Sequence, residues 1–91
     1  MAELFRLSVV TADATVFDGQ VEYVNIPTPF GSVGVLARHA PMLCAVEKGI
    51  LRFTSEQGEE RKIELGDGVA SVADNEATLL ISNARILGEE S

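Results

Sequence analysis

Cysteine, histidine and basic residues are all scarce in this sequence of 91 residues, and the shortages exclude classes of protein. The single cysteine, Cys44, cannot close an intrachain disulfide, which fits a reducing compartment. Only seven lysines and arginines stand against fourteen aspartates and glutamates, for a formal net charge of -7. Because phosphate binding needs clustered positive charge, the sequence argues against a nucleic-acid partner and against adsorption to an anionic membrane.

Long apolar runs are missing as well. No run approaches the ~20 residues of a membrane-spanning helix. The first residues, Met1-Ala2-Glu3, lack the positive and apolar regions of a secretory signal. The hydrophobic fraction of 46% is enough for one modest core, so the chain is expected to form a single globular domain. The default expectation is a soluble cytoplasmic protein.

Several short segments alternate between apolar and polar residues with the period of two that is typical of a half-buried strand. The expected core side of three such segments consists of Phe5, Leu7 and Val9, then Leu51 and Phe53, then Ile63 and Leu65. Residues 78–82, TLLIS, are apolar on both sides and are expected to form a central strand. No segment shows a helical stripe of useful length, so the pattern predicts an all-β protein.

Turn-forming residues separate these segments at intervals of roughly ten residues. Asp18-Gly19 has the composition of a two-residue type I′ hairpin turn, which needs a positive φ at both positions. Further reversals are expected at residues 55–58, 66–68 and 74–75. This rhythm predicts antiparallel strands arranged as two sheets packed face to face.

The segment from Tyr23 to Val46 is unusually poor in charge. Its only formally charged side chain is Arg38, although a stretch of that length in a chain that is 23% charged should carry about five. Pro27 is expected to end a strand that begins near Val21, because proline donates no hydrogen bond to a ladder. The loop that follows is rich in turn formers and should lie outside the core.

This loop is the first candidate for a binding site. Residues 28–33 are uncharged and framed by glycine, and the exposed apolar side chains of Phe30 and Val33 make a contact site plausible. After it, residues 33–36 are expected to form one short strand, and residues 39–41 to turn the chain again. His39 is either a satisfied loop histidine or an interface residue.

Catalytic and metal-binding hypotheses have less support in the sequence than a contact site. His39 and Cys44 would form a nucleophilic pair only with an orienting partner, and a buried inert cysteine is far more common in an apolar run. The glycines of residues 31–34 lack the lysine and helix of a phosphate loop. The carboxylates that might bind a cation are better explained as turn residues; they are Asp67, Asp74 and Glu76. We therefore expect no catalytic residue, no cofactor and no metal ligand.

Nearly the whole chain, from about Leu4 to Ala84, resembles the N-terminal domain of the epsilon subunit of F-type ATP synthases. The motifs that carry the resemblance are Val9-Val10-Thr11, Phe17-x-Gly19-x-Val21-Glu22, Gly31-x-x-Gly34, His39-Ala40-Pro41-x-Leu43 and Lys48-Gly49-x-Leu51-Arg52. This sequence departs from the family pattern at two places. Many members carry an acidic residue at the position of Ser32, and many carry Pro-Gly at the positions of Ala37-Arg38.

The resemblance implies a flattened antiparallel β-sandwich of about ten short strands. It also implies a noncatalytic rotor subunit that docks the gamma subunit to the membrane-embedded ring of c subunits and couples proton transport to ATP synthesis. Such a subunit lies at the cytoplasmic face of the cell membrane, or the equivalent face of an organelle membrane, without inserting into it. The implied ring contacts are Thr28, Phe30, Gly31, Ser32 and Val33. The implied gamma contacts are Thr11, Arg38, His39, Met42 and Cys44.

The end of the sequence departs from the family pattern, in which a pair of helices follows the sandwich. Residues 83–91 leave room for about two turns of helix, so we expect a sandwich domain over residues 1–84 and a short tail over residues 85–91. The chain is then either a naturally short subunit or a domain cut at its boundary. Two rival functions stay open: a small β-sandwich that binds a ligand or forms a homodimer, and an enzyme that uses His39 and Cys44.

Overall fold

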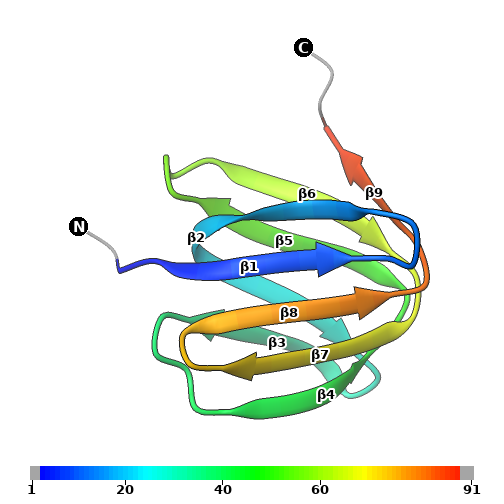
Figure 1. The fold of residues 1–91 in the computed structure, drawn as a ribbon, viewed down its shortest axis with the longest axis horizontal. Helices are drawn as coiled ribbons and strands as arrows, with labels where there is room; N and C mark the ends of the chain where they lie inside the picture. Colours follow the sequence, from blue (N-terminus) through cyan, green and yellow to red (C-terminus); the bar gives the residue numbers. More distant parts are fainter. Residues whose placement is uncertain (1–2, 89–91) are drawn as a thin grey trace.

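The computed structural model describes residues 3–88, and the regular structure in this range is entirely β-strand. The strands are β1 (Phe5–Val10), β2 (Thr15–Thr28), β3 (Gly31–Leu36), β4 (Met42–Val46), β5 (Gly49–Ser55), β6 (Glu60–Leu65), β7 (Gly68–Ala73), β8 (Glu76–Ile81) and β9 (Ala84–Leu87) (Figure 1). The prediction of an all-β protein is confirmed. The described residues include no helix of the length and apolar character that crossing a bilayer requires.

The long strand β2 joins the two layers of the sandwich. Hydrogen bonds connect the strands in the order β4-β7-β8-β1-β2-β5-β6-β9, with β3 also on β2. The first half of β2 pairs with β1, while the second half pairs with β3 and β5 after a shift in register between Val21 and Tyr23. The predicted sandwich is therefore one continuous sheet folded over on itself, and β2 takes part in both layers (Figure 1). This double use of β2 reconciles nine strands with the expected ten or so.

One strand pair departs from the predicted antiparallel arrangement. β1 and β8 are parallel, in register from Arg6 opposite Glu76 to Val10 opposite Leu80. The turn residues in the sequence report only on strands joined directly by a hairpin, whereas β1 and β8 are separated by most of the chain. All other pairings of the described strands are antiparallel.

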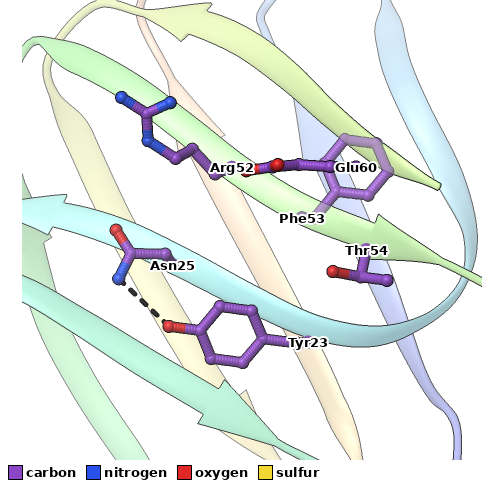
Figure 2. Close-up of a pocket in the computed structure, with 6 residues that line it drawn as sticks. All are labelled: Tyr23, Asn25, Arg52, Phe53, Thr54 and Glu60. Carbon is purple, nitrogen blue, oxygen red and sulfur yellow. Dashed lines mark hydrogen bonds between the residues drawn. The ribbon is translucent and has the colours of Figure 1, made fainter. Parts of the chain in front are cut away.

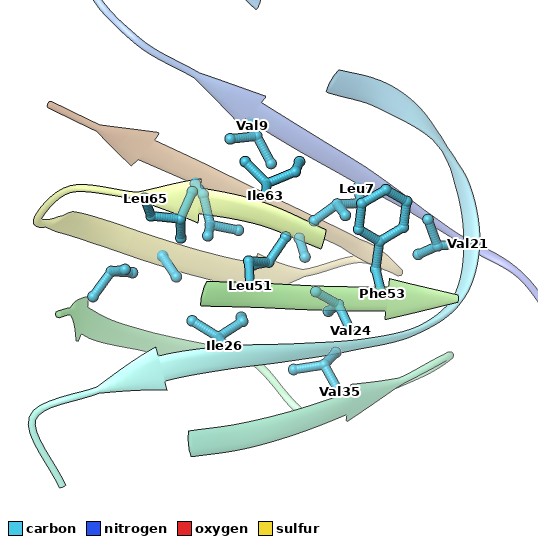
Figure 3. Packing of buried hydrophobic residues seen from close by; sticks show 14 of the residues in the cluster. Leu7, Val9, Val21, Val24, Ile26, Val35, Leu51, Phe53, Ile63 and Leu65 are labelled. Carbon is cyan, nitrogen blue, oxygen red and sulfur yellow. The ribbon is translucent and has the colours of Figure 1, made fainter. Parts of the chain in front are cut away.

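The core lies between the layers and is built from the alternating positions that the sequence indicated (Figure 3). Buried side chains include Phe5, Leu7, Val9, Leu51, Phe53, Ile63 and Leu65, so the predicted core side of all three segments is confirmed. β8 lies between β7 and β1, so the prediction of a central strand at residues 78–82 is confirmed. Because a layer has only one buried face, Leu79 enters the core while Leu80 remains 54% exposed.

The hairpin turn predicted at Asp18-Gly19 is wrong. These residues lie inside β2, opposite Ser8 and Leu7 of β1. The chain reverses instead at residues 11–14, where the Thr11 hydroxyl oxygen accepts the N–H groups of Asp13 (3.3 Å) and Ala14 (3.2 Å). Gly19 has a packing role, because a Cβ there would lie 3.2 Å from the Phe17 ring.

The type I′ geometry occurs at another of the predicted reversals. Asp74 and Asn75, between β7 and β8, have φ angles of 53° and 62°. Residues 55–58 and 66–68 also reverse the chain as predicted, between β5 and β6 and between β6 and β7. Asp-Gly and Asp-Asn are both compatible with this turn, so composition alone does not decide which pair of residues forms it.

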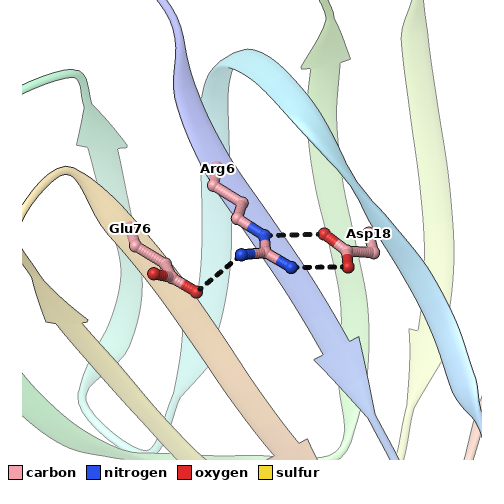
Figure 4. A network of polar contacts seen from close by, with 3 residues as sticks. All are labelled: Arg6, Asp18 and Glu76. Carbon is pink, nitrogen blue, oxygen red and sulfur yellow. Dashed lines mark hydrogen bonds and ion pairs between the residues drawn. The ribbon is translucent and has the colours of Figure 1, made fainter.

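Arg6 links three neighbouring strands on the outer surface of the β4-containing layer (Figure 4). Its Nε and Nη2 atoms donate to the two carboxylate oxygens of Asp18 on β2, each at 2.8 Å. Its Nη1 lies 3.8 Å from Oε2 of Glu76 on β8. The hydrogen bond from Arg6 holds the pKa of Asp18 below its ordinary value, and the bond to Asp18 raises the pKa of Arg6.

This pairing predicts a pH-dependent effect of Asp18→Asn. A lowered carboxylate pKa stabilises the fold above the ordinary aspartate pKa of about 3.9, and this stabilisation is lost as the pH falls through the folded-state value. The variant should therefore melt at a lower temperature than the parent at pH 7, and the two melting temperatures should converge as the pH falls below the ordinary aspartate pKa. Asp13→Asn, in the exposed turn at residues 11–14, is the matched charge change. A deficit that stays constant with pH would contradict the pairing.

The C-terminal part of the described chain is a strand. β9 pairs antiparallel with β6, and Arg85 Nη2 lies 2.6 Å from Oε1 of Glu64. The sequence left room for about two turns of helix in residues 83–91, but β9 forms instead. It pairs with the edge of β6, and its Ile86 side chain packs against the core. β9 begins at Ala84, so residues 85–87 of the expected tail pair with β6 as part of the sheet. Residues 89–91 of the expected tail lie outside the described residues, as do residues 1–2 of the N-terminal sequence.

Candidate functional site

The uncharged segment at residues 28–33 contains the tip of the hairpin between β2 and β3. β2 continues past Pro27, which was expected to end it, as far as Thr28, and β3 begins at Gly31. Thr28 accepts the N–H of Phe30 at its hydroxyl oxygen (3.2 Å) and donates its hydroxyl proton to the Gly31 carbonyl oxygen. Gly31 has a φ of 111°, an angle that is unfavourable for any residue with a Cβ. This turn holds Phe30 out into solvent, where 97% of it is exposed.

Not every predicted residue of this loop is at the surface. Ser32 is exposed, but Val33 is half-buried and packs against the core. Val33 lies opposite Ile26 of β2 and two positions before the buried Val35, so it faces inward. The expectation that residues 28–33 lie outside the core therefore fails at Val33.

Arg38 and His39 lie in the loop at residues 37–41, between β3 and β4. Arg38 adopts a φ of 65°, and its Nη2 atom lies 3.1 Å from Oε2 of Glu3. The Nδ1 atom of His39 donates to the Ala40 carbonyl oxygen at 2.7 Å. Within residues 3–88 no hydrogen bond joins His39 to Cys44, so the described geometry gives the proposed nucleophilic pair no support.

The two β4 side chains that the resemblance implies as gamma contacts, Met42 and Cys44, face the core. Met42 and Cys44 are half-buried and pack against the core, while Leu43 is 77% exposed and Ala45 is exposed too. Val46 ends the strand inside the core, and the period of two then turns Cys44 and Met42 inward with it. The outward positions of β4 are therefore Leu43 and Ala45.

The structure separates Thr11 from the other predicted gamma contacts. The backbone N–H of Arg38 donates to the side chain of Asn75 (2.8 Å), at the start of β8. Thr11 follows the far end of β1, which runs parallel to β8. Figure 1 shows the loop after β3 and the turn after β1 at opposite ends of the sandwich. Thr11 lies instead at the same end of the sandwich as the turn at residues 28–31. Glu47 follows the far end of β4, and its N–H donates to the Pro27 carbonyl oxygen (3.0 Å), which places that turn at this end.

The structure reveals an exposed apolar surface that the sequence analysis missed. Ala45, Val69, Leu80 and Val10 form one cross-strand row over β4, β7, β8 and β1. The next row contains Leu43, Ser71, Thr78 and Ser8. We call Leu43, Ala45, Val69 and Leu80 the outer apolar face; Val69 and Leu80 are 45% and 54% exposed. The sequence signal that could have indicated this surface is that residues 78–82 are apolar on both sides of the strand.

The outer apolar face has the character of a contact surface. Neither of its two rows carries a formal charge on β4, β7, β8 or β1. The second row continues from Ser8 to Asp18 on β2, and Arg6 and Glu76 lie one row further along. Exposed apolar patches bordered by polar residues commonly mark sites where another protein binds. The arrangement therefore suits docking rather than chemistry.

The opposite layer carries a shallow groove of about 410 Å³ (Figure 2). It is lined by Tyr23, Asn25, Arg52, Phe53, Thr54 and Glu60. Asn25 donates its side-chain N–H to the Tyr23 hydroxyl oxygen at 3.2 Å. The lining offers neither an imidazole nor a thiol for nucleophilic activation. In the described part of the chain, no group of three or more His, Cys, Asp or Glu side chains is arranged to hold a metal ion.

Comparison with known sequences gives a consistent family. The sequence model described as "ATP synthase, Delta/Epsilon chain, beta-sandwich domain" matches residues 4–86. An ATP synthase epsilon chain of Clostridium botulinum (strain Alaska E43 / Type E3) is 33% identical over 84 residues, which are 92% of this chain and 63% of that protein. The epsilon chain of Desulfitobacterium hafniense (strain DSM 10664 / DCB-2) is 36% identical over the same shares. The chain thus spans about three fifths of the length of these curated relatives.

Solved structures agree with the sequence comparison. A chain in the cryo-EM structure of the Euglena gracilis mitochondrial ATP synthase, containing OSCP, F1 and the c-ring, superposes with a TM-score of 0.87 at 26% identity, covering 97% of this chain and 56% of that one. A chain in the Tetrahymena thermophila mitochondrial ATP synthase central stalk and c-ring shares the fold, with a TM-score of 0.72 at 19% identity over 91% of this chain and 66% of that one. The protein therefore belongs to the family of ATP synthase delta/epsilon chain β-sandwich domains.

Proposed function

We propose that the chain is a noncatalytic central-stalk subunit of an F-type ATP synthase, which couples proton transport to ATP synthesis without binding a cofactor itself. The family match over residues 4–86 carries this proposal. The names of the curated relatives and the assemblies in which the two structural relatives occur support it. The subunit would be peripheral, on the cytoplasmic face of the cell membrane or the equivalent face of an organelle membrane.

The proposed role needs two separate contacts on a stiff body. The uncharged tip with Phe30 offers one, which we assign to the ring of c subunits together with Thr28, Gly31 and Ser32. Val33, which packs against the core, is not among the direct contacts. The outer apolar face and the loop with Arg38 and His39 offer the other, which we assign to the gamma subunit. A close-packed sandwich transmits torque between two such contacts with little deformation. Within the proposed gamma site, the exposed Leu43 replaces Met42 and Cys44 as a direct contact, and Thr11 belongs to the opposite end.

Association with identified partners tests the proposal. The full chain, tagged and expressed in its own cells, should co-purify with the gamma and c subunits, identified by mass spectrometry. Recovery of neither subunit would refute the proposal. The alternative of a homodimer through the outer apolar face predicts a mass that doubles with concentration in sedimentation, together with loss of the dimer in Leu43→Glu.

The contact assigned to the ring makes a separate prediction. Phe30→Ser should weaken association with isolated c-ring about tenfold, because an apolar side chain that packs at an interface is worth about 1 to 2 kcal/mol. The melting temperature should barely change, since 97% of Phe30 is already exposed. Leu36→Ser, at an exposed position at the far end of the same hairpin, is the matched control. Unchanged ring binding by Phe30→Ser would remove the tip from the contact.

A further inference from the structure

Asn75 connects three segments that are distant in the sequence. Its side-chain Oδ1 accepts the backbone N–H of Arg38 (2.8 Å), and its Nδ2 donates to the Leu4 carbonyl oxygen (3.0 Å). Its own carbonyl oxygen accepts the N–H of Arg6 (3.2 Å). One residue in the turn between β7 and β8 thereby fixes the loop at residues 37–41 to the start of β1.

The turn alone does not explain why position 75 is asparagine. Asp74 and Asn75 both adopt left-handed backbone angles, for which glycine is the least strained residue. Asp74 supplies only its backbone to the turn, and its carboxylate has no hydrogen-bond partner within residues 3–88. An amide side chain provides both an acceptor and a donor, and the contacts of Asn75 use both.

The loop that Asn75 holds contains a strained residue. Arg38 has a φ of 65°, in the left-handed region that is unfavourable for a residue with a Cβ. Such a conformation persists only where neighbouring groups enforce it. Two neighbours contact Arg38: Asn75 accepts its backbone N–H, and Glu3 pairs with its exposed guanidinium.

We propose that Asn75 is the positioning residue of the docking loop at residues 37–41. Its Oδ1 atom keeps Arg38 in the left-handed conformation and so presents the Arg38 and His39 side chains at the end of the sandwich where β8 begins. The docking role of the loop rests on the proposed function; the hold of Asn75 on the loop does not.

Three variants separate this role from general stability. Asn75→Gly keeps the turn and removes both side-chain hydrogen bonds. Asn75→Asp keeps the acceptor for Arg38 and loses the donor to Leu4. Asp74→Gly changes the neighbouring left-handed residue without touching either bond. The readout is hydrogen exchange of the Arg38 amide in the full chain, measured by NMR.

We expect the Arg38 amide to exchange about tenfold faster in Asn75→Gly, because the amide loses its hydrogen-bond acceptor together with the restraint on φ. Asn75→Asp and Asp74→Gly should exchange at the parental rate. Equal exchange in Asn75→Gly and the parent would overturn the proposal. So would equally fast exchange in Asn75→Asp, since the acceptor is then not what holds the loop.

A second readout concerns the partner. The affinity for isolated gamma subunit should fall several-fold in Asn75→Gly and stay near the parental value in Asn75→Asp, even though both lose the bond to Leu4. If Asn75→Gly frees the Arg38 amide but binds gamma as the parent does, the positioning role in docking is wrong and the proposed function stands. If the parent itself does not bind gamma, the proposed function fails, and the exchange rates alone decide whether Asn75 holds the loop.

Discussion

A Leu80→Glu substitution is expected to weaken association with the gamma subunit about a hundredfold while the chain stays folded. Leu80 lies in the middle of a cross-strand row, between Val69 and Val10, and is 54% exposed. A carboxylate placed there stays hydrated in the free chain but loses water in the complex. An unpaired polar group at an interface costs about 1 to 3 kcal/mol in proteins, and more when it is charged.

The outer apolar face offers the glutamate no basic partner of its own. Both cross-strand rows are uncharged over β4, β7, β8 and β1, and the nearby Arg6 is already engaged by Asp18 of β2. The dissociation constant is measured by calorimetry against isolated gamma subunit, and circular dichroism checks the fold. Gln57→Glu, in the exposed turn between β5 and β6, makes the same change in charge on a remote surface. If Leu80→Glu binds with parental affinity, gamma docks elsewhere and the outer apolar face needs another explanation.

A Gly68→Ala substitution is expected to lower the free energy of unfolding by about 3 kcal/mol. A Cβ on Gly68 would lie 2.1 Å from the Leu80 carbonyl oxygen and 2.8 Å from the Ile81 Cα. Both atoms belong to the backbone of β8, which hydrogen bonds hold between β7 and β1. Because neither neighbour can rotate away, the clash must be relieved by separating β7 from β8, at the upper end of the usual cost of overpacking.

Urea unfolding measures this loss as a lower midpoint at an unchanged slope. Gly58→Asn serves as the control, since Gly58 has a φ of 85° and a Cβ there would meet nothing within 4 Å. Asparagine tolerates left-handed backbone angles, so this variant should stay within about 1 kcal/mol of the parent. A Gly68→Ala variant as stable as the parent would mean that β7 and β8 do not approach so closely at Gly68.

The candidate site shows how far alternation along a strand can be used. The sequence singled out the segment from Tyr23 to Val46, and the structure does place an exposed tip at Phe30 and an exposed loop at Arg38 within it. On β4 the apolar run has no polar residue to mark the outer side, and the resemblance implied Met42 and Cys44, not the exposed Leu43, as contacts. A strand whose two sides are both apolar does not reveal its orientation until its neighbours are known.

Contacts between segments that are distant in the sequence could not be predicted at all. Thr11 is separated from Arg38 because β1 spans the sandwich between the two ends. The sequence predicted only a turn at Asn75, because the partners of its side chain, Leu4 and Arg38, are 71 and 37 residues away. The parallel contact of β1 with β8, which brings Leu80 beside Val10, has no local signal at all.

The sequence by itself determined the class of fold, most of the strands and the inward side of those strands on which charged and apolar residues alternate. Local physics is sufficient there, because a charged residue such as Arg6 or Glu64 cannot enter the core without a partner. Only the tertiary structure decided which strands share a layer, where β2 passes from one layer to the other, and which apolar side chains remain outside. Those outcomes depend on packing between distant segments, and a short window of sequence contains no information about the surface on which it will pack.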